Sequence, residues 1–166
     1  MAGYICNPAG VNLTTTYASA GDAPFALGTC GDLNDGGKVI LVESSASACS
    51  TYSAVVISET FKATQLTTGN ARSSGNRIAF AQTSIGTGRV GWVHLSGQNL
   101  VVNLAANCAP YVPLYTTATG GTLDDATVSG SGGMVMGVFA VTSISNATAT
   151  TCVINTLPFV AKLVGS

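Results

Sequence analysis

The chain has 166 residues, of which 46% are hydrophobic and only 8% are charged. Soluble domains usually contain roughly 25% charged residues, so this chain is unusually poor in charge. Six Lys and Arg against seven Asp and Glu leave a net charge of −1, which excludes the basic footprint of a nucleic-acid-binding protein. The length suits one domain that buries its own core.

Targeting and membrane segments are not expected. No run of about 18 apolar residues occurs, because Gly, Ser and Thr interrupt the apolar blocks. Residues 1–6 lack a basic start followed by an apolar stretch, so we expect cytosolic synthesis and no disulfides. The cysteines form no C-x-x-C pair and are expected to be buried free thiols. They are Cys6, Cys30, Cys49, Cys108 and Cys152.

Residues 1–35 show no regular pattern, because Gly and Pro separate single apolar residues. The segment is too apolar for a solvated tail. We therefore predict an N-terminal arm that becomes ordered by lying along another protein surface and burying these side chains there. The expected contact residues of the arm are Tyr4, Ile5, Val11, Leu13, Tyr17, Phe25 and Leu27.

Residues 36–166 resemble a β-domain, since short runs rich in Val and Ile alternate with turn residues. The expected strands are residues 38–43, 54–58, 77–82, 89–95, 100–105, 111–116, 134–142, 151–154 and 159–164. Residues 77–105 predict a three-stranded meander, and residues 59–66 are compatible with a short amphipathic helix. The predicted fold is all-β, a β-sandwich or β-barrel of about eight or more short, mostly antiparallel strands behind an extended arm.

The run over residues 134–142 is apolar on both faces. Alternation along an unbroken strand puts Met134, Met136 and Val138 on one face. Phe139 and the other odd-numbered residues of the run then lie on the opposite face. A strand of this kind lies between two layers or faces another subunit, so we predict subunit contacts at all four residues.

No pattern for catalysis or metal binding is found. His94 is the only histidine, and no nucleophile motif surrounds it or Ser96. The adjacent carboxylates Asp124 and Asp125 follow two glycines and predict turn residues rather than a calcium or catalytic site. We therefore expect a protein without catalytic residues, metal or cofactor. A small hydrolase that uses His94 with Ser96 or a cysteine is kept as a third hypothesis.

Several segments together resemble the capsid decoration proteins of tailed bacteriophages, also called cement or head-stabilising proteins. The segments are YSAVVISETFKATQLTT (52–68), RIAFAQTSIGTGRVGWVHLSGQNLVVNLAANC (77–108), VPLYTTATGGTLDDA (112–126) and INTLPFVAKL (154–163). The similarity covers most of the chain after residue 37 and rests on the combination of segments, since each one alone is weakly specific.

The resemblance implies a structural virion protein, made in the host bacterial cytoplasm and bound to the outside of an icosahedral capsid. Its partners would be the major capsid protein and itself, as a trimer, and it would clamp neighbouring capsomers. An alternative is a host-recognition module of a head or tail fibre that binds glycan through Trp92, Tyr111 and Tyr115. Neither hypothesis involves nucleic acid or a membrane.

Overall fold

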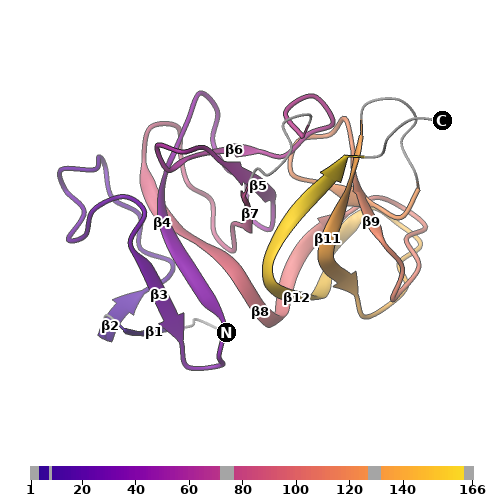
Figure 1. Cartoon of the computed structure of the whole chain (residues 1–166), viewed down its shortest axis with the longest axis horizontal. Coiled ribbons are helices and arrows are strands. Elements are labelled where there is room, and N and C mark those ends of the chain that lie inside the picture. The colour runs from indigo at the N-terminus through magenta and orange to yellow at the C-terminus, as the bar shows by residue number, and fades with distance from the viewer. Residues whose placement is uncertain (1–3, 8, 72–76, 127–131, 163–166) are drawn as a thin grey trace.

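The computed structural model describes the backbone of residues 4–7, 9–71, 77–126 and 132–162. Side chains are described in the same ranges except at residues 4–7, 9, 10, 155–157, 159, 161 and 162. These ranges contain strands and turns but no helix, so the all-β prediction is confirmed (Figure 1). No helix in the described part of the chain is long and apolar enough to cross a membrane.

Within the described ranges, twelve strands are paired into one sheet. They are β1 (Tyr4–Asn7), β2 (Ala9–Asn12), β3 (Cys30–Leu33), β4 (Lys38–Ser44), β5 (Ala54–Ile57), β6 (Lys62–Gln65), β7 (Arg77–Phe80), β8 (Val90–Leu104), β9 (Leu114–Thr116), β10 (Leu123–Asp124), β11 (Gly133–Ala140) and β12 (Thr148–Lys162).

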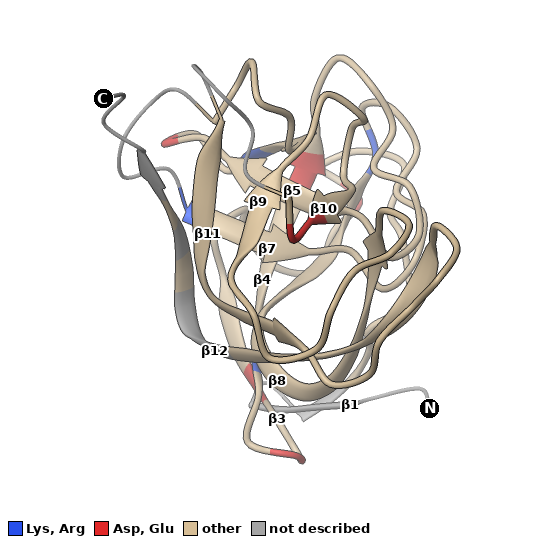
Figure 2. Cartoon of the chain, turned by 90° about the vertical axis from the view of Figure 1, so that its right-hand side faces the viewer, with Lys and Arg blue, Asp and Glu red and all other residues tan. Residues whose placement is uncertain are grey.

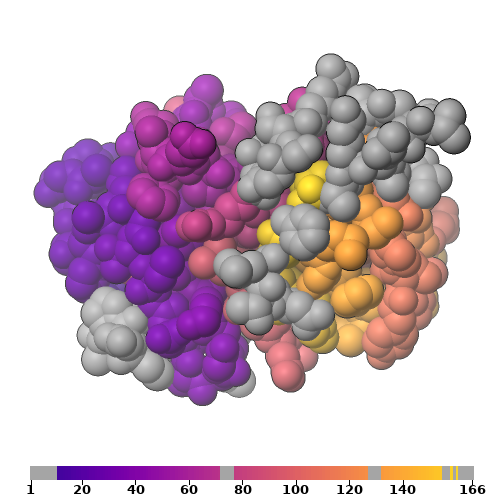
Figure 3. Space-filling view, in the orientation of Figure 1, coloured from indigo at the N-terminus to yellow at the C-terminus, as the bar shows by residue number. Residues whose placement is uncertain are grey.

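The pairings close two rings that share strand β8. The first ring runs β8–β7–β5–β6–β4 and returns to β8, and the second runs β8–β10–β9–β11–β12 and returns to β8. In Figure 1, β8 crosses between the N-terminal and C-terminal parts of the chain, and Figure 3 shows these parts as two lobes side by side. The expected β-barrel body is therefore present, with two closed circuits of strands.

The apolar residues form three clusters separated by strands. One cluster fills the first ring, and a second lies between β5, β7 and the strands of the second ring. The third packs the N-terminal segment against the outer face of β4 and β8. Strands β4, β5, β7 and the first half of β8 are therefore buried on both faces, which explains their unbroken apolar runs.

This stacking also accounts for much of the low charge. A charged side chain on a strand that is buried on both faces would lose its water without gaining a partner. The chain exposes 7654 Å², close to the roughly 7,600 Å² of a compact monomer of its mass. The charged residues appear as separate spots on an otherwise uncharged ribbon in Figure 2.

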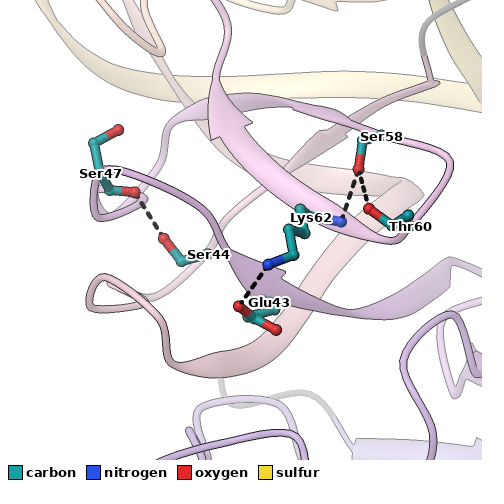
Figure 4. Close-up of polar contacts among 6 residues, drawn as sticks. All are labelled: Glu43, Ser44, Ser47, Ser58, Thr60 and Lys62. Carbon is teal, nitrogen blue, oxygen red and sulfur yellow. Dashed lines mark hydrogen bonds and ion pairs between the residues drawn. The ribbon is translucent and has the colours of Figure 1, made fainter.

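Strand β6 closes the first ring through a short parallel pairing with β4. Glu43 lies opposite Lys62 in this pairing, and their side chains form an ion pair of 3.2 Å (Figure 4). The Ser58 Oγ accepts a hydrogen bond from the Lys62 backbone N–H, which fixes the turn between β5 and β6. Because the ion pair is partly exposed to water, we assign the closure mainly to backbone pairing.

Strand β6 also corrects the helix expected over residues 59–66. Residues 62–65 pair with β5 on one side and with β4 on the other. Phe61 has a φ of 59°, which is incompatible with a right-handed helix at that point. Sheet pairing on both edges therefore overrides the weak helical periodicity.

The expected three-stranded meander over residues 77–105 is also wrong. The runs 89–95 and 100–105 are parts of the single strand β8, which bends at Gly97 (φ 153°) and Asn99 (φ 58°) without reversing. The first half of β8 pairs with β4 and the second half with β12. In the same way, β12 joins the run 151–154 to the described part of the run expected at 159–164.

The N-terminal segment packs on its own chain. Leu13 is buried, and Val11, Tyr17, Phe25 and Leu27 are half-buried against the outer face of β4 and β8. Backbone hydrogen bonds join Tyr17 with Val90 and Gly28 with Leu41. These side chains are thus ordered without a second protein, and their contact with a partner stays a prediction. The side chains of Tyr4 and Ile5 lie outside the described residues.

Removing Phe25 should expose the only tryptophan. Phe25 meets Trp92 edge to face, with ring centroids 6.2 Å apart, and Trp92 is 1% exposed. We expect Phe25→Ala to red-shift Trp92 fluorescence and to cost roughly 2 kcal/mol of unfolding free energy, less than truncation of a fully buried Phe. Ala26→Ser, at an exposed neighbouring position, should change neither quantity. Unchanged emission from Phe25→Ala would contradict this packing.

Candidate functional site

The sheet of β9, β11 and β12 carries partly exposed apolar side chains on its outer face. Tyr115 on β9 lies opposite Met134 on β11, and Phe139 on β11 lies opposite Val153 on β12. Met136, also on β11, is 38% exposed, and the other four are half-buried. Their buried neighbours along each strand point into the core, so these five residues point outward. We call Tyr115, Met134, Met136, Phe139 and Val153 the β11 face.

A bulge in β11 corrects one predicted subunit contact. The register with β12 shifts between Met136 and Val138, and Gly137 has a φ of 83°, a backbone conformation that favours glycine. The extra residue resets the alternation, so Val138 is fully buried in the core and Phe139 turns outward. Val138 therefore cannot touch another subunit, whereas Met134, Met136 and Phe139 lie at the surface.

A cavity of about 490 Å³ with polar and apolar walls lies beside the middle of β8. Its wall includes Asp35 from the β3–β4 turn, Tyr52 from the β4–β5 connection, and His94 and Asn99 from β8. The proximity of these residues was not predicted, because they come from segments far apart in the chain. The backbone at Asn99 has a positive φ within the continuous strand β8.

His94 is buried in this wall, at 6% exposure, and its Nδ1 has no hydrogen-bond partner among the described residues. Burial lowers the pKa of His94 to about 4, against a smaller opposite effect of Asp35, so the imidazole is neutral at pH 7. The Ser96 Oγ accepts a hydrogen bond from the Lys38 backbone N–H at 3.2 Å. No hydrogen bond between His94 and Ser96 occurs in the described structure, so the pair does not form a nucleophile–base couple as it stands.

The cysteines of the described residues are free thiols, as expected, but not all are buried. Cys49, Cys108 and Cys152 are buried, and Cys30 is exposed. Burial raises the pKa of all three buried thiols, to about 11 for Cys108 and about 12 for Cys152. These groups are protonated near neutral pH and are therefore poor nucleophiles. The side chain of Cys6 lies outside the described residues.

Asp124 and Asp125 lie near Cys108, with one potential ligand atom of each within 4.8 Å of the others. One Asp125 carboxylate oxygen accepts a hydrogen bond from the Ala109 backbone N–H at 2.8 Å. Burial and the two carboxylates hold the Cys108 sulfur as a thiol, whereas a metal ligand would be the thiolate. The arrangement thus agrees with the predicted structural role of the carboxylates, although Asp125 bonds across 16 residues rather than within its turn.

The aromatic residues of the glycan-binding alternative have different surroundings. Trp92 is buried under Phe25 and cannot stack on a sugar ring. Tyr111 is 70% exposed, and Tyr115 belongs to the β11 face. Only the two tyrosines of this alternative are therefore accessible to a ligand.

No protein-family model matches the chain, and no curated protein matches it either.

The buried neutral His94 should make stability depend on pH. The unfolded chain binds a proton at this residue near pH 6.5, but the folded chain does so only near pH 4. The unfolded state thus holds more protons between these values, and the folded state loses up to about 3 kcal/mol as the pH falls through this window.

Urea denaturation of the wild type and of His94→Gln at about pH 7 and about pH 4 measures this effect. The variant should lose less stability on acidification, by up to the same amount. An equal loss in both proteins would show that His94 is not the titrating group.

Proposed function

We propose that this protein is a structural virion protein that binds the outside of an icosahedral bacteriophage capsid and clamps neighbouring capsomers. In this proposal the protein has no catalytic role, associates with itself as a trimer, and contacts the major capsid protein. The observation that carries the self-association is the β11 face, where five apolar side chains point away from a core that is already filled.

The chemistry of the β11 face suits a protein partner. Met and aromatic side chains are enriched at the centres of protein interfaces, and charged residues are depleted there. The β11 face contains one tyrosine, two methionines and one phenylalanine, and no charged residue. A second copy of the chain is the occupant that we assign to it, because a symmetric assembly repeats such a contact at every subunit.

The arm, residues 1–35, is assigned to the capsid contact. Its described apolar side chains are mostly half-buried rather than fully buried, so part of their surface is left for another protein. Deleting the arm is not a clean test, since deletion would uncover Trp92 and the outer face of β4. Point substitutions on the exposed faces are the better tools.

Met136→Asp should separate the subunits without unfolding them. Desolvating an unpaired carboxylate costs several kcal/mol at an interface, but Met136 is partly in water within one chain. We expect light scattering to show a trimer for the wild type and a folded monomer for Met136→Asp. Val138→Asp, two residues away in the core, should fail to fold. Ala46→Asp, at an exposed site on the β4–β5 connection, should remain trimeric.

The same proteins are then mixed with undecorated expanded capsids and sedimented. The wild type and Ala46→Asp should sediment with the shells, and the monomeric Met136→Asp should do so much less. Failure of the wild type to bind would reject the capsid proposal. If Met136→Asp remains a trimer, the subunit contact does not lie on the β11 face.

The host-recognition alternative retains one supporting observation, the exposure of Tyr111 at 70%. In that case a glycan array should show binding that Tyr111→Ala abolishes, while the protein stays absent from the capsid lattice. Binding to the lattice with an empty array would favour the structural role.

A further inference from the structure

The cavity beside β8 is separate from the β11 face and from the capsid proposal. It lies where the N-terminal segment, the β3–β4 turn and the middle of β8 meet, and Leu13, Leu33 and Leu100 supply its apolar wall. Its volume of about 490 Å³ falls in the range of small-molecule sites, about 300–1,000 Å³. A cavity of this size has room for one or two sugar rings.

Some polar groups of the wall are engaged by the protein and others are not. No hydrogen bond in the described part of the chain uses the His94 ring or the side-chain amides of Gln98 and Asn99, although the Nδ1 of His94 is itself fully buried. Gln82 differs, because both ends of its amide bond to the Val101 backbone, at 2.8 and 3.0 Å. Gln82 therefore stabilises the wall, one Asp35 carboxylate oxygen accepts from the Gly37 backbone N–H, and the amides of Gln98 and Asn99 are left for a ligand.

The backbone at the cavity is held in an unusual conformation. Tyr52 and Asn99 both line it, and both have a positive φ, 61° and 58°. Such positions cost free energy and persist where the surrounding structure holds them in place. These two backbone positions place the side chains of Tyr52 and Asn99, which are far apart in the sequence, at the same cavity.

The charged residues that line the cavity indicate which class of ligand it can bind. Among the described lining residues, Asp35 is the only one with a full charge, and no Lys or Arg is present. An anion would meet this carboxylate without a compensating cation, so phosphate or sulfate is disfavoured. Amides, hydroxyls, a neutral imidazole and a carboxylate both donate to and accept from hydroxyl groups, and the leucines fit the C–H faces of a sugar ring.

We propose that this cavity binds a neutral saccharide unit, with His94 and Asn99 as hydrogen-bonding residues and the leucines as its apolar wall. The ligand lies across the middle of β8, so its binding ties the N-terminal segment to the β3–β4 turn. The site is formed by one chain and does not depend on the oligomer or on the capsid.

Saturation-transfer NMR on the wild-type protein tests the site directly, with glucose, galactose, mannose and N-acetylglucosamine as probes and inorganic phosphate as the anionic comparison. At least one sugar should receive saturation and shift the imidazole resonances of His94, and phosphate should do neither. If no sugar shifts His94, or if only phosphate does, the proposal is overturned.

Asn99→Gly is a specific test, because glycine tolerates the positive φ of this position and removes the side-chain amide. The matched control is Asn107→Gly, at another exposed asparagine with a φ of 63° that does not line the cavity. We expect Asn99→Gly to weaken the sugar that binds roughly three- to tenfold, the loss of about one hydrogen bond, with no change for Asn107→Gly. Equal affinity in Asn99→Gly and the wild type would show that Asn99 does not contact the sugar. Equal weakening in Asn99→Gly and Asn107→Gly would show a non-specific effect.

Discussion

The structure depends on one strand, β8, which belongs to both closed rings. Its first half pairs with β4 and its second half with β12, and every residue from Val90 to Gly97 is buried. The backbone of such a strand is satisfied by neighbours on its edges, and its side chains by packing on two faces. The bend at Gly97 and Asn99 lets one strand belong to two closed rings, and Asn99 in this bend lines the cavity beside β8.

The burial of strands such as β8 on both faces gives a second explanation for the low charge of the chain. The low charged fraction first suggests a surface that other protein covers, but strands buried on both faces already remove many positions where a charge could stand. The apolar surface that is left is local, and the β11 face is its clearest part. The proposed role on a capsid therefore needs only this face and the half-buried arm, rather than a generally adhesive surface.

The sequence predicted the fold class and the positions of β4, β5, β7 and β11, because runs of Val, Ile and Leu bounded by turn residues are a local signal. The errors come from non-local causes. Pairing on both edges made residues 62–65 a strand, and different partners for its two halves kept β8 continuous. The bulge at Gly137 reversed the faces after Met136, so Val138 is a core residue. The cavity could not be predicted, since Tyr52, His94 and Asn99 meet only in the folded chain.

A reconstruction by electron cryomicroscopy of expanded capsids mixed with this protein tests the central claim most directly. We expect trimeric density on the outside of the shell, with the β11 faces of three copies turned toward one another and the N-terminal lobe against the major capsid protein. Shells without added density, or density in which the β11 face points to solvent, would contradict it.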